Sequence, residues 1–174
     1  LTLGAKDYYL NNDAATVAIR EAYKTYLSKM FQLYGFSADE AAKKASAVFL
    51  HETTLATFSK SRTELRNPQA NYNKMTLAEF KENYPNIPLE ALANAEGIKS
   101  EYLKEMIVGQ PAFFAGYDKV AAAECAGTLK ALMEWDIICS SASYLSDEIS
   151  EARFEFFGKI MSGRKEDYPL WKRA

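Results

Sequence analysis

The chain has 174 residues, of which 48% are hydrophobic and 25% are charged, a composition that is typical of a globular fold and excludes extended disorder. The net charge is −2 and the 21 basic residues are scattered, so the sequence lacks the electrostatic footprint of a nucleic-acid-binding protein. No apolar run reaches the roughly 18 residues that a membrane-spanning helix needs, so no such segment is expected in this chain. The sequence starts at Leu1 without methionine, which is consistent with a piece of a longer precursor whose targeting segment lies upstream.

Two helices are predicted in the first third of the chain. Apolar residues recur at helical spacing over residues 13–34, and Gly35 ends this pattern. Ser37 and Glu40 then form a capping-box motif for a second helix, which runs to about Phe58. Because only a few residues join the two helices, we expect them to form an antiparallel hairpin with an aromatic-rich core.

The stretch 59–75 is polar and is predicted to be an irregular loop. Pro68 disfavours helical geometry at Asn67, so a turn is expected there. A functional interpretation makes Arg66 and Asn73 contact a substrate, whereas a structural one makes them hold the loop against the preceding helix. The structural interpretation is favoured because apolar residues that would anchor a loop are interspersed with the turn formers; they are Leu65, Tyr72 and Met75.

Helices and one possible strand are predicted between residues 76 and 123. Thr76 and Glu79 form another capping-box motif, and Gly97 ends a later helix. The predicted helices cover residues 76–83, 89–95 and 111–123. The run 105–109 is the only plausible strand, and no partner for it is evident.

The longest apolar stretch, residues 124–145, is apolar on most of its helical circumference and therefore predicts a long, buried central helix. Asp136 lies within it, where a carboxylate is costly unless it is paired. A final helix is predicted over 146–163, and the tail 168–171 is expected to pack back onto the body. The expected fold is all-α, with antiparallel helix hairpins, and residues 1–174 are expected to form a single compact helical unit.

One stretch begins like a zinc-peptidase helix. A metal-binding HExxH motif needs histidines at i and i+4, which places both imidazoles on one face of a helix. Here His51 and Glu52 are followed by Leu55 at the position of the second histidine, and the chain contains no other histidine. His51 and Glu52 also remain the most tempting acid–base pair, although neighbours in sequence point about 100° apart on a helix. We therefore predict no catalytic and no metal-ligating residue, and leave substrate-binding residues unassigned.

Other features of the sequence indicate no further chemistry. No glycine-rich phosphate loop and no GxSxG motif is present. If Cys125 and Cys139 lie on one helix, they are roughly 20 Å apart, too far for a disulfide. Two small buried hydrophobes are the favoured interpretation, with intermolecular pairing or a reactive thiol as alternatives. The remaining carboxylates of note, Glu148, Glu151 and Glu155, indicate a solvated helix face beside Arg153.

Five collinear segments together resemble the non-catalytic helical region of neprilysin-like zinc endopeptidases, the family that includes neprilysin, endothelin-converting enzyme and bacterial PepO. The first segment, where Gly4-Ala5-Lys6 departs from the family's Pro-x-Arg, affects the expected loop shape only. In chain order the matching residues are Leu1-Thr2-Leu3-Gly4 with Asp7-Tyr8-Tyr9-Leu10, then Glu52-Thr53 to Leu55-Ala56, Glu64-Leu65-Arg66-Asn67-Pro68 to Tyr72-Asn73-Lys74-Met75-Thr76-Leu77, Leu132-Met133-Glu134-Trp135, and Phe154 to Phe156-Phe157-Gly158 with Trp171-Lys172-Arg173.

The resemblance implies that this chain is a fragment of the helical lobe of a two-lobed zinc metalloendopeptidase. In that family the zinc motifs and the catalytic acid lie further towards the C-terminus, so no catalytic residue is carried over to this chain. Zinc is then expected in the full-length parent and not in this chain, and the expected partners are the parent's catalytic lobe and peptide substrates. The implied role is to wall a chamber and limit substrate size, outside the cytoplasm: periplasmic, cell-envelope or secreted. The alternative is a stand-alone helical interaction module.

Overall fold

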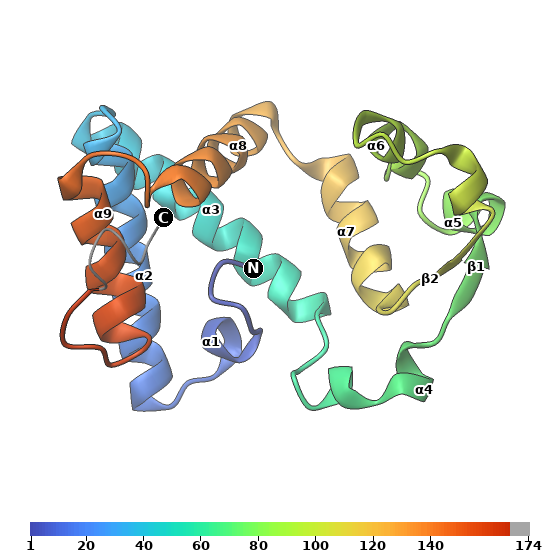
Figure 1. Cartoon of the computed structure of the whole chain (residues 1–174), viewed down its shortest axis with the longest axis horizontal. Coiled ribbons are helices and arrows are strands. Elements are labelled where there is room, and N and C mark those ends of the chain that lie inside the picture. The colour runs from blue at the N-terminus through green and yellow to red at the C-terminus, as the bar shows by residue number, and fades with distance from the viewer. Residues whose placement is uncertain (168–174) are drawn as a thin grey trace. The chain divides into compact units, whose positions relative to one another are not determined.

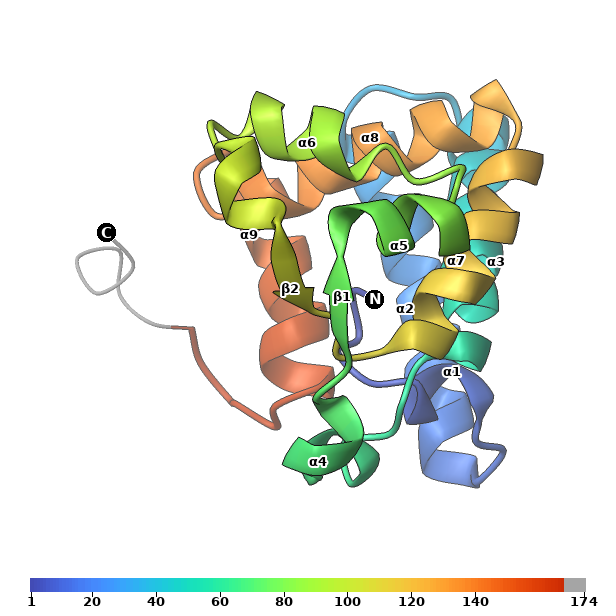
Figure 2. The ribbon, with the colours of Figure 1, turned by 90° about the vertical axis from the view of Figure 1, so that its right-hand side faces the viewer.

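The computed structural model describes residues 1–167, and contacts divide them into two compact units. Unit 1 consists of Leu1–Lys6 and Thr54–Glu124, and unit 2 consists of Asp7–Thr53 and residues 125–167. The chain is mostly helical, which confirms the predicted fold class (Figures 1 and 2). The expectation of a single helical unit over residues 1–174 stays a prediction.

Unit 2 is built from long helices. Helix α2 lies beside α9 and η3, and it also contacts α1 and α8 (Figure 1). Helix α3 starts in this unit and its last residues belong to unit 1. The bounds are α1 Asp7–Leu10, α2 Ala14–Leu33, α3 Ala38–Phe58, α8 Ala126–Ser141, α9 Asp147–Arg153 and the π-helix η3 Phe154–Ile160.

The predicted hairpin of α2 and α3 is confirmed. Tyr23, midway along α2, contacts Phe49 just past the middle of α3, with 6.4 Å between ring centroids. Phe31, near the end of α2, contacts Phe36 just before α3 at 5.8 Å. The end of α2 therefore lies beside the residues that lead into α3 and the middles of the two helices meet, which is the pattern of an antiparallel pair. Gly35 makes the tight connection possible because its φ of 105° disfavours any residue with a side chain.

The core of unit 2 is aromatic. Tyr26 stacks on Phe156 with 4.9 Å between ring centroids, and Trp135 lies edge-on to Tyr26 at 5.7 Å. Trp135 also contacts Phe31 at 6.0 Å, so one indole ring joins α8 to two rings in the second half of α2. The largest fully buried side chains of this unit are Tyr23, Leu27, Met30, Phe31, Val48, Ile138 and Phe156.

Helix α8 exists where a buried central helix was predicted, but only one of its faces is buried. Its inner face is buried through Ala131, Trp135 and Ile138. Its other face is exposed and carries Leu129, Met133 and Ile137. Asp136 lies on the exposed side, so the expected cost of a buried carboxylate does not arise.

Unit 1 consists of short elements around a small core. This core contains Phe80, Tyr84, Ile87 and Val108. The predicted helices are confirmed, and Thr76 and Glu79 form a complete capping box. The bounds are η1 Glu64–Arg66, α4 Pro68–Asn71, β1 Lys74–Thr76, α5 Leu77–Asn83, α6 Leu89–Ala95, η2 Ser100–Leu103, β2 Glu105–Ile107 and α7 Pro111–Ala123.

A two-stranded antiparallel sheet corrects the prediction of an unpaired strand. The expected strand is β2, and it pairs with β1, of which Lys74 and Met75 were assigned to a loop and Thr76 to the start of a helix (Figure 2). Met75 lies opposite Met106 in the register, and both side chains pack against the core of unit 1. The sequence does not reveal this pairing because three-residue strands are too short to show an alternating pattern.

The final predicted helix also differs from expectation, because after α9 it continues as the π-helix η3. A Cβ atom on Gly158 would lie 2.1 Å from the Phe154 ring, so the close approach of that ring depends on glycine. The predicted packing of the tail 168–171, and the final matching segment Trp171-Lys172-Arg173, lie outside the described residues. Within residues 1–167 we find no helix that is both long and apolar enough to cross a membrane.

Candidate functional site

The carboxylate of Glu52 is buried in unit 2, with its residue only 7% exposed. The Tyr23 hydroxyl donates a hydrogen bond to Oε2 of Glu52 at 2.6 Å, and the Tyr9 hydroxyl donates to the same atom at 3.0 Å. Glu52 therefore joins α1, α2 and α3 through charge-assisted hydrogen bonds. The arrangement is that of a carboxylate that joins packed helices, and the absence of an acid–base role for Glu52 with His51 stays a prediction.

Aromatic rings enclose this carboxylate. Tyr9 lies edge-on to Tyr23 with 6.4 Å between centroids and tilted against Phe49 at 6.2 Å, and Tyr23 in turn contacts Trp135 at 6.4 Å. An unpaired carboxylate would be very costly in such surroundings, and the two phenol donors offset that cost. We call Tyr9, Tyr23 and Glu52 the Glu52 cluster.

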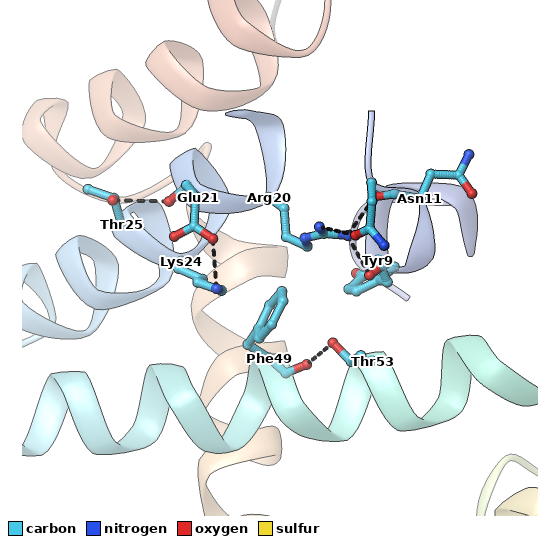
Figure 3. Close-up of polar contacts among 9 residues, drawn as sticks. Tyr9, Asn11, Arg20, Glu21, Lys24, Thr25, Phe49 and Thr53 are labelled. Carbon is cyan, nitrogen blue, oxygen red and sulfur yellow. Dashed lines mark hydrogen bonds and ion pairs between the residues drawn. The ribbon is translucent and has the colours of Figure 1, made fainter. Parts of the chain in front are cut away.

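Arg20 holds the backbone of residues 9–12 in place, and this segment carries the Tyr9 side chain of the Glu52 cluster. Its Nη1 donates to the backbone carbonyls of Tyr9 at 2.7 Å and Asn11 at 2.9 Å (Figure 3). Its Nη2 donates to Oδ1 of Asn12 at 3.1 Å. Sequence analysis missed this role because a single arginine on a helix surface carries no signal for non-local carbonyl acceptors.

A groove of about 400 Å³ lies between α2 and α3 in the same unit. At its rim Lys24 donates to Glu21 at 2.8 Å and lies over the Phe49 ring at 4.8 Å (Figure 3). Small residues of α3 line the groove beside Phe49 and Leu50. It suits an apolar side chain beside one cation. The lining residues are Lys24, Ser28, Ala42, Ala45, Ser46, Phe49 and Leu50.

The described residues do not form a metal centre. No group of three or more His, Cys, Asp or Glu side chains in residues 1–167 is arranged to hold a metal ion. Cys125 is exposed and caps the start of α8, where its Sγ accepts from the Thr128 backbone N–H at 3.5 Å. Cys139 is half-buried, and burial raises the pKa of its thiol. The expectation of two buried cysteines is therefore wrong for Cys125, and neither forms a disulfide within the described chain.

Lys60 organises the loop that was predicted to be irregular. Its Nζ donates to the Ala70 carbonyl at 3.0 Å, to Oδ1 of Asn71 at 2.8 Å and to the Gly109 carbonyl at 3.1 Å. Its backbone N–H donates to Oε1 of Gln110 at 2.8 Å. One side chain thus joins α4 to the segment that precedes α7. Nothing in the sequence distinguishes Lys60 from a surface lysine, so its role was missed.

Two asparagines bond to backbone groups within this loop, and the interpretation that Arg66 and Asn73 hold the loop against the preceding helix stays a prediction. Asn67 caps α4 by accepting from the backbone N–H groups of Gln69 and Ala70. Asn73 donates from Nδ2 to the Ala70 carbonyl at 3.2 Å, and its own carbonyl accepts from Val108 N–H at 2.8 Å.

The expected loop anchors are only partly right. Met75 packs against the core of unit 1, whereas Leu65 and Tyr72 are 43% and 62% exposed. Arg66 is also exposed. Hydrogen bonds rather than apolar anchors therefore hold this loop.

A buried carboxylate in unit 1 holds the proline-rich turn before α6. Asp118 on α7 is 9% exposed and accepts from the Asn86 backbone N–H at 2.7 Å and from Asn86 Nδ2 at 3.0 Å. Sequence analysis missed it because the two residues are far apart along the chain. Like Glu52 in unit 2, Asp118 is a buried carboxylate that joins separate elements of its unit through hydrogen bonds.

The segment Leu132–Trp135, singled out in the sequence, also has a packing role. Trp135 is buried in the unit 2 core, and Glu134 forms an ion pair with Lys44 of α3 at 2.5 Å. Both partners are largely shielded, with side chains 19% and 18% exposed. The fold and its polar clusters thus define a helical domain whose two buried carboxylates, Glu52 and Asp118, are held by hydrogen bonds.

This chain belongs to peptidase family M13, since the model of the family's N-terminal domain matches residues 1–174. Rat and mouse endothelin-converting enzyme-like 1 are each 24% identical to it over 175 residues, which is 98% of this chain and 22% of the relative. The zinc metalloprotease Zmp1 of Mycobacterium tuberculosis in complex with an inhibitor superimposes with a TM-score of 0.91 at 25% identity, over 98% of this chain and 26% of Zmp1. The open state of Zmp1 gives the same TM-score. This chain therefore spans about a quarter of the length of these relatives.

Proposed function

We propose that this chain is a non-catalytic part of the helical lobe of a zinc metalloendopeptidase that hydrolyses short peptides. In this role it walls the substrate chamber and limits the size of the peptides that enter. The observation that carries the proposal is the match of the family's N-terminal domain to the whole chain, which spans only a quarter of its zinc metalloprotease relative.

The residues present here do not fit a zinc site, so the metal of the parent enzyme belongs to polypeptide outside this chain. A single histidine cannot complete an HExxH motif, and Glu52, its neighbour, is already bonded to two tyrosines. The catalytic lobe of the same polypeptide is then the main partner of this chain, and peptides are its substrates.

The steric role is supported by the rigidity of unit 2. Stacked and edge-on rings fill its core, and side chains in such close-packed interiors transmit strain and do not yield easily. A wall of this kind admits a flexible peptide and excludes a folded protein without contacting the reacting atoms. We place the parent protein outside the cytoplasm, on family resemblance, and fractionation of the source cells tests this.

The test starts with the coding sequence downstream of Ala174, where an HExxH motif is expected. The longer polypeptide is then expected to bind zinc and to cleave short peptides, with rates that fall as peptides lengthen and no cleavage of a folded protein. A variant that replaces the motif's glutamate with glutamine is the control, since it removes the chemistry and leaves the chamber intact. A reading frame that stops at Ala174, with a co-purifying partner, would instead support the stand-alone interaction module.

A further inference from the structure

Helix α8 carries an exposed apolar strip on the side opposite its buried face. Leu129, Met133 and Ile137 follow one another at intervals of four residues, and they are 46%, 68% and 54% exposed. Residues at i, i+4 and i+8 lie along one line of a helix. Ala126 and Ser140 extend this line at both ends and are exposed too. We call these five residues the outer face of α8.

Charged residues border the outer face and do not interrupt it. Lys130 lies on one side and Asp136 on the other, and both are exposed. The inner face is buried against the core of unit 2 through Ala131, Trp135 and Ile138. Because α8 is apolar on two sides, it has the character of a helix that is enclosed by protein.

The spacing of the outer face fits another helix. Its residues recur at intervals of three and four, which is the spacing of positions that interdigitate between packed helices. The small residues at both ends allow a neighbouring backbone to come close. Burying large aliphatic side chains such as these three is generally favourable, so a partner surface gains from covering them.

We propose that the outer face of α8 packs against an amphipathic helix contributed by the part of the same peptidase polypeptide that lies outside residues 1–174. This inference rests on the proposed function. Relatives are about four times as long as this chain, which covers 22% to 26% of them, so most of the parent polypeptide is available to supply that helix.

A second copy of this chain is a weaker partner for this face. A stable interface between separate proteins typically involves roughly 20–30 residues on each side. Five residues in a single line are far fewer, and they suffice only where the partner is already tethered. A helix in the same polypeptide meets this condition because covalent connection gives it a high effective concentration.

The test measures thiol labelling in the longer polypeptide. Met133→Cys is introduced together with Cys125→Ser and Cys139→Ala, and labelling is followed by peptide-level mass spectrometry. Glu151→Cys in the same background is the matched control, since Glu151 is exposed on α9 within the same unit. Each rate is compared with that of the same protein in denaturant.

The expected result is that the thiol at position 133 labels at least about tenfold more slowly than the one at position 151, because it reacts only when the packed helices open. Equal rates at the two positions overturn the proposal, and protection that grows with protein concentration assigns the face to a second copy and also overturns it. Peptide cleavage is assayed on the same samples. Cleavage without protection rejects the packing alone, whereas protection without cleavage rejects the proposed function alone.

Discussion

The two units use different means to hold their residues in place. Unit 2 encloses large rings between long helices, with Trp135 in contact with three aromatic residues of α2. Unit 1 has a smaller core around Phe80 and Tyr84, and its short elements are joined by hydrogen bonds that the Lys60 side chain donates and the Asp118 carboxylate accepts.

The difference follows from element length. Helices of 20 and 21 residues, as α2 and α3 are, present wide apolar faces whose burial dominates stability. Elements of three to seven residues such as β1 and α5 bury little and are marginal alone, so directional bonds must fix them. Substitutions in the two units should therefore differ in kind.

The largest effect is expected from Trp135→Ala in unit 2. The change removes a buried indole, 4% exposed, and should lower the free energy of unfolding by about 3–5 kcal/mol. Met133→Ala on the outer face of the same helix is the control. Because Met133 is exposed in this chain, the free energy of unfolding of this variant should fall by no more than about 0.5 kcal/mol. Denaturant unfolding followed by circular dichroism measures both, and similar losses would contradict the inner–outer distinction.

In unit 1, Gly116→Val breaks a close helix contact. A Cβ atom at position 116 would lie 2.2 Å from Cγ of Phe58, so the ring or α7 must move. Overpacking of this kind typically costs about 1–3 kcal/mol. Gly127→Ala in α8 is the matched control, since its nearest neighbour is Cys125 Sγ at 3.8 Å and no loss is expected. A second change, Phe58→Leu, should recover part of the loss, and the absence of any recovery would show that another contact is responsible.

Lys60→Met tests the hydrogen bonds of unit 1. The substitution keeps the aliphatic chain and leaves two backbone carbonyls and Asn71 without their donor, which should cost about 1–3 kcal/mol. Amide hydrogen exchange is expected to increase around residues 70–73 and 109. Lys119→Met, an exposed position on α7, should leave exchange unchanged. If both variants exchange alike, Lys60 does not organise the loop.

A pH titration tests how much the capping boxes, which depend on ionised carboxylates, contribute to stability. The Ser61 hydroxyl and backbone N–H donate to Glu64, Lys6 lies nearby, and these contacts lower the pKa of Glu64 from its ordinary value of 4.5 to about 2. Hydrogen bonds from Ser37 and Thr76 likewise lower the pKa of Glu40 and Glu79.

A folded-state pKa below the unfolded one gives stability that is present above pH 4.5 and is lost as the pH falls towards about 2. Thermal unfolding midpoints should therefore drop over this range. The drop should be smaller in Ser61→Ala, because Glu64 then keeps a pKa nearer its ordinary value. A Ser61→Ala protein with the full pH dependence would exclude this cap as a source.

The smallest effect is expected from Tyr26→Phe in unit 2. The Tyr26 hydroxyl is buried, burial raises its pKa, and it bonds to no partner within the described chain. Removing an unpaired buried hydroxyl should leave stability within about 1 kcal/mol of the parent, or raise it. Tyr23→Phe is the control and should lose stability, because that hydroxyl donates to Glu52. A larger loss for Tyr26→Phe than for Tyr23→Phe would contradict this assignment.

Local signals made most helices of this fold predictable. Asp13, Gly35, the Ser37–Glu40 box and the Thr76–Glu79 box mark helix ends through contacts between residues near in sequence. The same type of box at Ser61 and Glu64 was overlooked inside a stretch assigned to loop.

Non-local contacts account for what the sequence did not reveal. The pairing of β1 with β2, the reach of Lys60 to Gly109 and the bond from Asn86 to Asp118 join residues about 30 to 50 positions apart, and no local pattern records them. For the candidate site, the single histidine excluded zinc ligation by HExxH, but it gave no hint that Glu52 would be enclosed by tyrosines.

Unit 2 is discontinuous in sequence, because Thr54–Glu124 lies between its two halves, and this affects how the protein is made. A ribosome delivers α2 and most of α3 first, then nearly all of unit 1, and only afterwards the rings of Trp135 and Phe156. During this interval the nascent chain displays the apolar side of α2 without its final cover. Chaperone binding is therefore expected to last until Phe156 emerges, and unit 1 to gain its native contacts first.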